Sequence, residues 1–310
     1  MTAHTLIVNS SIAEGLDVIG DRWSLLILRD AFLGRRRFEE FRRYTGASKA
    51  TLARRLTALI NQGVMIKVNA PGAAKRMEYR LTEMGAALFP SSMLAWQWEL
   101  EWLDAGASGS LPYQLIHRRC GQPLKPSPVC AGCEMPFQLN EMRLPHADQD
   151  PARHIEEIKS LSGQRRVRSS AKKDGEDLNL AGISDLIGDR WTLLILISAF
   201  FGVRRHDVFL KQLNIASNIL SHRLTLLLDN GVFERRTYQA SPPRNEYFLS
   251  NKGLSLFPLI IAMRQWAVAW EENPAAVTAL QHSPCGDVLS VRVKCEACHE
   301  LIERHEVDYI

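Results

Sequence analysis

Long apolar runs are missing from this sequence. No stretch of the 310 residues approaches the roughly 18 consecutive apolar residues that a membrane-spanning helix needs. The opening residues also lack the combination of a basic start, an apolar run and a small-residue cleavage site that marks a secretory leader. From these absences we expect a cytoplasmic protein that does not enter the membrane.

Patterns typical of catalysis are also missing. The sequence has no Gly-rich phosphate loop and no closed set of nucleophile, base and acid side chains. Its hydrophobic content of 46% is close to the globular average, so the chain can form ordinary cores and disorder is not expected. The net charge of +4 is too small to identify a partner by itself. We therefore expect a folded protein that is not an enzyme.

Cysteine is confined to two short segments. All six cysteines fall in two tight triplets, one after residue 119 and one after residue 284. In a cytosolic protein this clustering favours metal binding or thiol chemistry over structural disulfides.

What the sequence does contain is a long repeat. Residues Asp17–Trp23 and Asp185–Trp191 read Asp-Val-Ile-Gly-Asp-Arg-Trp and Asp-Leu-Ile-Gly-Asp-Arg-Trp, displaced by 191 − 23 = 168 positions. The same offset places Gly34 on Gly202, Arg55 on Arg223, Gly63 on Gly231, Glu78 on Glu246, Tyr79 on Tyr247 and Phe89-Pro90 on Phe257-Pro258. A repeat of this size is a complete fold, and two such folds can act as a covalent dimer.

Each copy shows the same order of local signals. In the first copy, apolar spacing predicts helices over residues 11–20, 22–33 and 38–44. A further helix is expected from its cap Ser48 to about Asn61. The turn at Gly46-Ala47 joins the last two helices into a helix-turn-helix. In the second copy this motif is expected over 206–230.

A β-hairpin is expected directly after each helix pair. In the first copy, residues 64–68 and 77–81 have strand character, and the loop 69–76 between them has a basic tip. A closing helix is predicted from Thr82 to Trp102, interrupted or kinked near Pro90. The second copy repeats the hairpin over 233–249 and the closing helix over 251–270.

These signals predict five segments along the chain. We expect domains at 1–105 and 177–273, Cys/His modules at 106–143 and 274–310, and a basic linker at 144–176. The charges of the linker are either solvated or in contact with phosphate.

Several runs in both copies resemble those of a known family. The runs Ile-Gly-Asp-Arg-Trp-Ser-Leu-Leu-Ile-Leu, Gly-Arg-Arg-Arg-Phe-Glu-Glu-Phe, Leu-Ala-Arg-Arg-Leu and Glu-Tyr-Arg-Leu-Thr-Glu-Met-Gly resemble HxlR-type winged helix-turn-helix transcriptional regulators. The second copy keeps Ile-Gly-Asp-Arg-Trp-Thr-Leu-Leu-Ile-Leu and Ser-His-Arg-Leu. The chain is thus similar to two members in tandem.

The resemblance implies both a fold and a function. The fold class is mainly α with small β-hairpin wings (α+β): two winged helix-turn-helix domains, each followed by a small cysteine-rich module. The implied function is a sequence-specific double-stranded DNA-binding transcriptional regulator, a repressor, that acts on an operator as a covalent pseudo-dimer. Members are typically single-domain proteins that dimerise, so this chain departs by fusion, and it acts as a monomeric pseudo-dimer or as a homodimer. A second departure is His206 in place of Phe38, which predicts weaker apolar packing there.

Clustered positive charge supports a DNA-binding face in the first copy. Residues 35–55 hold seven arginines and one lysine against two acids, whereas 203–223 hold three arginines and one lysine against one acid. The predicted DNA contacts of the first copy are Arg35, Arg36, Arg42, Arg43, Lys49, Thr51, Arg54, Arg55, Lys75 and Arg76. Those of the second copy are Ser217, Asn218, Ser221, His222, Arg223 and Arg244.

Two alternatives accompany this interpretation. Isolated surface arginines are usually only solvated. One or both winged helices can also have lost DNA contact and serve as a protein-interaction module, for which the weaker basic face of the second copy is a sign. Charge reversal at Arg54 and Arg55 is expected to weaken DNA binding and to leave a protein adaptor unaffected.

The cysteine triplets have metal-ligand spacing. The first module reads His117-x2-Cys120-x9-Cys130-x2-Cys133, and the second repeats this spacing at His282, Cys285, Cys295 and Cys298. Three cysteines and one histidine can close a tetrahedral structural Zn site, so we expect one such site in each module. His299 is an alternative ligand to His282.

The metal interpretation also has alternatives. The cysteines can sense a redox or small-molecule effector, or they can be inert. A zinc-dependent hydrolase is disfavoured, because three cysteines and one histidine leave no coordination position for water.

Overall fold

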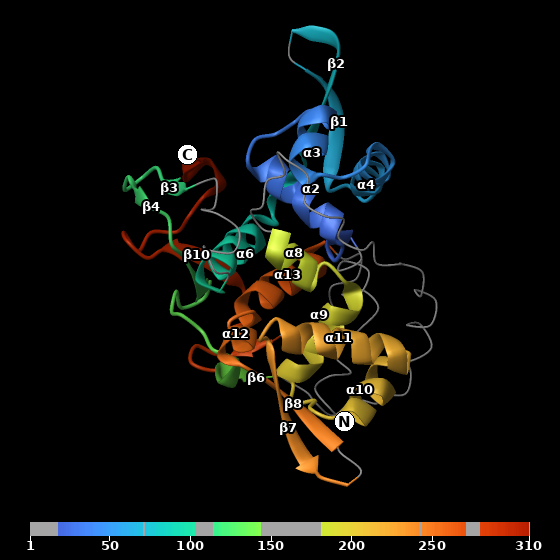
Figure 1. Cartoon of the computed structure of the whole chain (residues 1–310). Helices are drawn as coiled ribbons and strands as arrows, with labels where there is room; N and C mark the ends of the chain where they lie inside the picture. The colour runs from blue at the N-terminus through green and yellow to red at the C-terminus, as the bar shows by residue number, and fades with distance from the viewer. Residues whose placement is uncertain are drawn as a thin grey trace. The chain divides into compact units, whose positions relative to one another are not determined.

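The computed structural model describes residues 18–70, 72–102, 114–143, 181–241, 244–270 and 280–309 (Figure 1). The predicted helix at 11–20 and the predicted linker at 144–176 lie largely or wholly outside these residues. The chain forms two compact units. The copy-1 unit contains the described residues of Asp17–Pro128, Val167–Gly188 and Arg292–Ile310, and the copy-2 unit those of Val129–Arg166 and Asp189–Val291.

The copy-1 unit begins with a helix pair and its supporting helix. These are α2 (Arg22–Phe32), α3 (Phe38–Thr45) and α4 (Lys49–Asn61). The predicted bounds are confirmed to within a residue or so. Gly46 ends α3 in the left-handed region at φ 68°, and Ser48 caps α4 by accepting a hydrogen bond from the backbone N–H of Thr51. Phe41 and Leu52 are fully buried between these helices.

The wing of the copy-1 unit consists of β1 (Met65–Ala70) and β2 (Ala73–Leu81), paired antiparallel from Met65↔Leu81 onward. Both strands extend into the segment 69–76 that the sequence predicts as a loop, so Arg76 lies within β2. The closing helix is interrupted into α5 (Glu83–Ala86) and α6 (Phe89–Trp102). Pro90 is the second residue of α6, where its missing N–H has no intrahelical partner to lose.

Helix α8 (Ala181–Ile187) belongs to the copy-1 unit although its sequence is part of the second copy. It contacts α2 and α6. Arg22 on α2 forms an ion pair with Asp185, and the backbone N–H of Ile183 donates to Glu99 on α6 at 3.2 Å. The helix that precedes the second Gly-Asp-Arg-Trp run therefore packs on elements of the first copy.

The copy-2 unit repeats the first through the same order of elements. It contains α9 (Arg190–Phe200), α10 (His206–Leu213), α11 (Ser217–Asp229), β7 (Phe233–Gln239), β8 (Arg244–Leu249), α12 (Asn251–Leu254) and α13 (Phe257–Ala269). Asn214, which matches Gly46, adopts the same left-handed conformation at φ 47°. Phe209, which matches Phe41, is again fully buried. The mainly α fold with small β-hairpin wings is confirmed.

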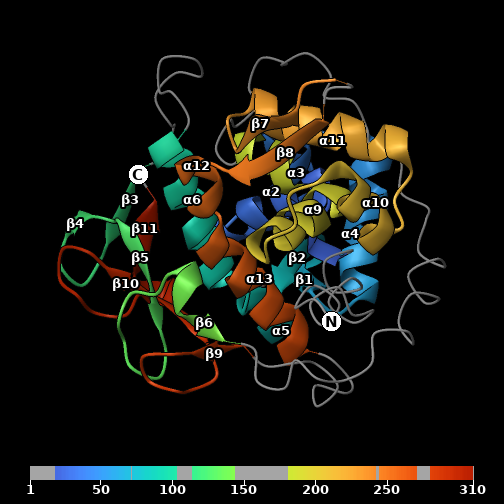
Figure 2. The same cartoon turned by 90° about the horizontal axis from the view of Figure 1, so that it is seen from below.

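Short strands form the Cys/His modules. In the copy-1 unit, β11 (Val307–Tyr309), β3 (Leu115–His117) and β4 (Gln122–Pro123) lie side by side in one sheet (Figure 2). In the copy-2 unit, β6 (Met142–Arg143) pairs with β9 (Gln281–His282). The chain passes from one unit to the other within β5 (Pro126–Cys130) and at the start of β10 (Val291–Cys295).

Two single 3-10 turns complete the modules, at Leu139–Glu141 and Arg304–Glu306. Among the described residues, no helix has the length and apolarity that crossing a bilayer requires.

Candidate nucleic-acid interface and metal clusters

Helix α4 presents one polar face to solvent. Its buried side is apolar, with Leu52, Leu56 and Leu59 at most 1% exposed. The opposite side is exposed and carries Lys49, Ala50, Ala53, Arg54 and Thr57. Thr51 is half-buried beside the cap Ser48. Because α4 is the second helix of a helix-turn-helix, its exposed face is the one that such folds place in the major groove.

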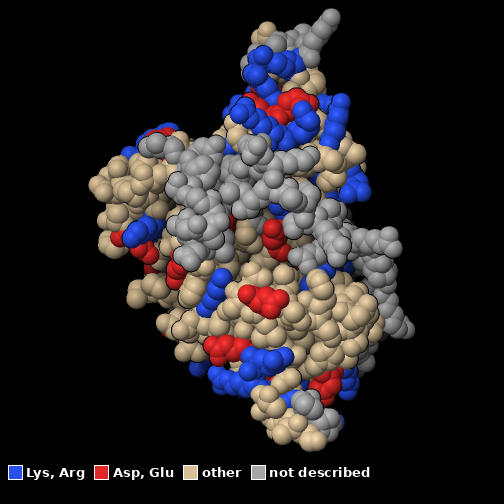
Figure 3. Space-filling view, in the orientation of Figure 1, with Lys and Arg blue, Asp and Glu red and all other residues tan. Residues whose placement is uncertain are grey.

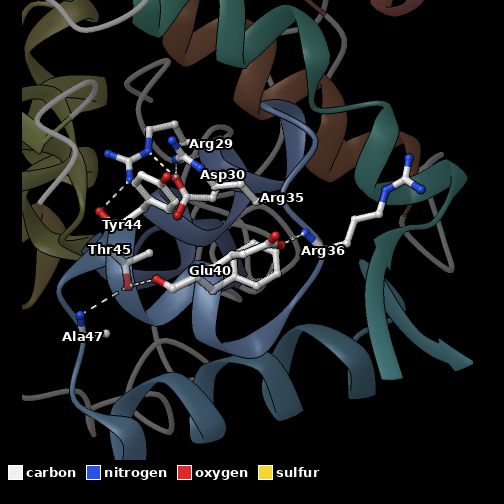
Figure 4. Close-up of polar contacts among 9 residues, drawn as sticks. Arg29, Asp30, Arg35, Arg36, Glu40, Tyr44, Thr45 and Ala47 are labelled. Carbon is white, nitrogen blue, oxygen red and sulfur yellow. Dashed lines mark hydrogen bonds and ion pairs between the residues drawn. The ribbon is translucent and has the colours of Figure 1, made fainter. Parts of the chain in front are cut away.

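Arg35 lies in a buried ion-pair cluster rather than on this face (Figure 4). Its Nη1 donates to Asp30 Oδ1 at 2.6 Å, and its guanidinium stacks 3.5 Å from the ring centroid of Tyr44. Arg29 Nε donates to the same Asp30 oxygen at 2.8 Å, and Arg29 Nη2 donates to the Tyr44 carbonyl at 3.1 Å. Arg35 is thus a half-buried side chain that pairs with a fully buried carboxylate.

Arg55 and Arg223, two of the predicted DNA contacts, lie against the N-cap aspartates of their units. Arg55 Nε lies 3.2 Å from Asp21 Oδ1, and Asp21 is the N-cap of α2. In the copy-2 unit, Arg223 binds Asp189, the N-cap of α9, through two hydrogen bonds of 2.9 and 2.6 Å. The aspartate of each Gly-Asp-Arg-Trp run thus ties the recognition helix to the supporting helix. Positive charge counts cannot reveal this pairing.

Other predicted contacts of the first copy do point outward. Arg36, Arg42 and Arg43 are exposed, and so is Arg76 on the wing. Figure 4 shows the Arg36 side chain directed away from the buried cluster. Arg42 forms an exposed ion pair with Glu39 at 2.6 Å. The Lys75 side chain lies outside what the structure describes.

Figure 3 shows Lys and Arg side chains gathered where Figure 1 labels β1, β2 and α3, with acidic side chains among them. Such clustering of exposed cations suits a phosphate backbone, which needs local charge density rather than a high total charge.

The recognition helix of the copy-2 unit is polar but nearly uncharged on its outer face. Ser217, Asn218, Ser221 and His222 are all exposed along α11, and Arg244 is exposed at the start of β8. His206, which replaces Phe38, is half-buried, and its Nε2 lies 3.2 Å from Ser221 Oγ. Phe38 is itself only half-buried, so the expected loss of core packing does not arise at this position.

Three exposed arginines of the copy-2 unit escaped prediction. Arg235 and Arg236 lie on β7, and Arg204 precedes α10. The guanidinium groups of Arg204 and Arg236 stack on Phe248 at 4.5 and 4.4 Å from the ring centroid. The consecutive arginines in a predicted strand were the available signal. Much of the positive charge of this unit therefore lies on its wing rather than on its helix pair.

The eight predicted metal ligands form two clusters, but not in the predicted groups. One cluster combines His117, Cys120, Cys295 and Cys298 in the copy-1 unit. The other combines Cys130, Cys133, His282 and Cys285 in the copy-2 unit. The expectation that each module closes its own site is wrong. Each cluster takes the His-x2-Cys pair of one module and the Cys-x2-Cys pair of the other.

The distances within the two clusters are nearly identical. In the copy-1 cluster, Cys120 Sγ is 4.0 Å from Cys295 Sγ, and His117 Nδ1 is 3.4 and 3.3 Å from the sulfurs of Cys120 and Cys298. In the copy-2 cluster, the equivalent distances are 3.9, 3.4 and 3.4 Å. A tetrahedral Zn2+ with ordinary bond lengths has S···S and N···S edges of about 3.8 and 3.5 Å. The donors therefore fit zinc.

Local turns hold the ligand pairs in place. Gly121 and Gly286 have positive φ of 69° and 79°, and their N–H groups return to the carbonyls of His117 and His282 at 2.7 and 2.8 Å. His299 follows the last cysteine with φ 60° and occupies the turn position that Glu134 has after Cys133. His299 is thus a turn residue, and His282 is the histidine that lies within the copy-2 cluster.

Both ligand histidines are fully buried, with the Nδ1 atom directed at the sulfurs. The other ring nitrogen, Nε2, lies 3.7 Å from a carboxylate oxygen of Glu306 in one cluster and of Glu141 in the other. A carboxylate behind the second nitrogen is a common feature of metal-bound histidines, because it fixes the ring orientation.

Electrostatics in the clusters favour a cation. The backbone N–H of Gln122 donates to Cys120 and lowers the pKa of that thiol below its ordinary value. At Cys285 the N–H of Asp287 acts in the same direction, but burial and the neighbouring thiols of Cys133 and Cys130 raise the pKa to about 11. Thiolates so close together repel one another, and a divalent metal removes that repulsion.

These observations define a class of protein: a tandem winged helix-turn-helix protein with Cys/His modules. The HxlR-like helix-turn-helix family model matches residues 18–107 and 186–275, and the chain belongs to this family.

An uncharacterized HTH-type transcriptional regulator of Mycobacterium tuberculosis is 38% identical over 139 residues, which cover 44% of this chain and 87% of the relative. Another from Synechocystis is 32% identical over 99 residues, covering 32% of this chain and 73% of the relative. The crystal structure of PA1607, described as a candidate transcription factor, is 41% identical, covers 42% of this chain and 90% of its own, and has a TM-score of 0.38. The relatives from Mycobacterium tuberculosis and Synechocystis are both named HTH-type transcriptional regulators, which supports DNA-binding regulation.

Proposed function

We propose that this protein is a sequence-specific double-stranded DNA-binding repressor in which two copies act as a covalent pseudo-dimer. The observation that carries the proposal is that the basic residues of α4 differ in their surroundings. Arg55 fixes the helix through Asp21, while Lys49 and Arg54 stay on its outer face. A helix that is held to the fold through one face and carries cations on its exposed face is suited to the major groove.

The two copies read unlike half-sites in this proposal. Arg54 in the first copy is suited to a bidentate contact with guanine. The matched position in the second copy is His222, and Asn218 nearby is suited to adenine. Phosphate contacts come from Arg36, Arg43 and Arg76 in the first copy. In the second copy they come largely from the wing.

We further propose that both clusters hold structural Zn2+. Their donor sets, the inter-ligand distances and the carboxylates behind His117 and His282 support this assignment. Four protein ligands leave no position for a reacting water, so the metal is structural.

The test is fluorescence anisotropy on the duplex upstream of the protein's own gene, with a shuffled duplex and a salt series. We expect tight binding to the upstream duplex only, with affinity that falls steeply as salt rises. Arg54→Glu should abolish the preference. Arg292→Glu, an exposed arginine on β10, is the matched control and should leave it intact. No binding to either duplex at low salt would reject the proposal.

A further inference from the structure

The exchange of ligand pairs extends to the backbone around both clusters. In the copy-1 unit, Arg118 N–H donates to the Glu306 carbonyl at 2.7 Å, and Glu296 N–H donates to the Lys125 carbonyl at 3.0 Å. In the copy-2 unit, Ala131 N–H donates to Ser290 O at 2.7 Å and Ser283 N–H to Glu141 O at 2.8 Å. Each unit therefore contains a hybrid module, made of the first half of one Cys/His module and the second half of the other.

The strand pairs next to the clusters are short. β6 and β9 pair over two residues, and β3 and β11 over three. Strand pairs of this length are not stable alone in water. In a small module with such short strands, the free energy of metal binding adds to the free energy of folding.

We propose that the Cys/His module is a metal-dependent pairing device whose partner is a second copy of the same module. Each Zn2+ joins half of one module to half of the other, so each metal links residues of the first sequence copy to residues of the second. This rests on the proposed zinc sites, and it adds a partner to them: one module alone leaves each metal with only two ligands in the observed arrangement.

Matched double substitutions in the full chain separate this arrangement from closure within each module. Cys120→Ser/Cys298→Ser removes two ligands from the copy-1 cluster and leaves the copy-2 cluster complete. Cys120→Ser/Cys133→Ser removes one ligand from each cluster. Both variants lose two thiols, and closure within modules would reverse their consequences, because Cys120 and Cys133 would then share a site.

The measurement is the zinc content per chain by elemental analysis, after exposure to a chelator that leaves the wild-type zinc in place. We expect two zinc ions in the wild type, one in Cys120→Ser/Cys298→Ser and none in Cys120→Ser/Cys133→Ser. The reverse order for the two variants, with two in the wild type, would overturn the exchange and leave zinc binding intact. No zinc in the wild type would overturn the zinc proposal itself, and DNA binding is measured separately.

A second measurement uses the wild-type chain and so does not depend on how the variants fold. A short cross-linker with two thiol-reactive ends is added while zinc is withdrawn, and the linked peptides are identified by mass spectrometry. We expect Cys120 linked to the peptide that holds Cys295 and Cys298, and Cys285 linked to the peptide that holds Cys130 and Cys133. Links from Cys120 to Cys130 or Cys133 in place of these would overturn the proposal.

Discussion

The two units have the same elements but use charge differently at matched positions. The buried cluster of Arg29, Asp30 and Arg35 in the copy-1 unit corresponds to Ile197, Ser198 and Val203 in the copy-2 unit. The Ser198 hydroxyl donates a hydrogen bond to the Leu194 carbonyl at 2.6 Å. One fold therefore accepts either an ion-pair cluster or an apolar patch at the same place, as expected if a buried ion pair and a packed apolar group are similar in net stability.

The pairing of the N-cap aspartate with the recognition helix is the feature that both units keep. Asp21–Arg55 and Asp189–Arg223 occupy matched positions, while the outward residues 54 and 222 differ in charge. The two units thus share the residues that position the recognition helix and differ in the residue that faces outward next to them. This is the pattern expected if the two copies contact different sequences.

The largest effect is expected from removing the central carboxylate of the buried cluster. Asp30→Ala leaves Arg29 and Arg35 as buried cations with a lost partner, which should lower the free energy of unfolding by about 3–5 kcal/mol. The matched Ser198→Ala in the copy-2 unit should cost about 1 kcal/mol, because it removes a neutral hydroxyl rather than a buried charge. Urea unfolding followed by circular dichroism measures both. Equal effects would show that the Arg29–Asp30–Arg35 cluster contributes nothing special.

The N-cap aspartates should rank second. Each loses a cap worth ~1 kcal/mol when changed to alanine. Asp189→Ala should cost more than Asp21→Ala, because Asp189 makes a bidentate pair with Arg223, whereas Arg55 lies at 3.2 Å from a single oxygen of Asp21. Thermal unfolding of the two variants gives the order. A larger loss for Asp21→Ala would contradict the geometric ranking.

Base reading should be unequal between the copies. Arg54→Ala should weaken specific DNA binding by about 1–3 kcal/mol and relax the preference at one base pair. His222→Ala should relax a position in the other half-site with a smaller loss. Selection of preferred sequences from a random duplex pool, performed with the wild type and both variants, locates each change. If both variants relax the same position, the two copies do not read separate half-sites.

The smallest effects belong to single phosphate contacts. Arg43→Gln on α3 and Arg236→Gln on β7 should each weaken binding to all duplexes alike and reduce the slope of log affinity against log salt by about 1. Arg236 tests whether the wing of the copy-2 unit contacts phosphate. An unchanged slope for Arg236→Gln would leave the copy-2 unit without this phosphate contact.

Much of the fold was accessible from the sequence because the repeat displays every signal twice. The cap Ser48, the turn at Gly46 and the apolar face of α4 are local features, and local features determine helix bounds. The strands β1 and β2 are longer than predicted, because their backbone pairing continues past the residues with alternating apolar and polar character. The place of α8 could not be predicted, since α2 and α6, which it contacts, are distant from it in the sequence.

The surroundings of the candidate site residues were harder to predict. Arg54 and Arg55 are adjacent and chemically alike, and the ion pair with Asp21, 34 residues away, is a long-range contact that no local signal indicates. The ligand sets were ambiguous because the two modules have identical spacing. Residue type and spacing identified the eight candidate ligands, but no local feature of the sequence indicates which pairs come together.

The exchange of ligand pairs also imposes an order in time on synthesis of the chain. Cys295 lies 175 residues after Cys120, its partner in the copy-1 cluster. At translation rates of about 5–20 residues per second, His117 and Cys120 wait on the order of 10 s or longer before Cys295 and Cys298 exist. A chain that stops early cannot complete this cluster, even when its first winged helix is whole. The copy-1 cluster can therefore be completed only in chains whose synthesis has reached Cys298.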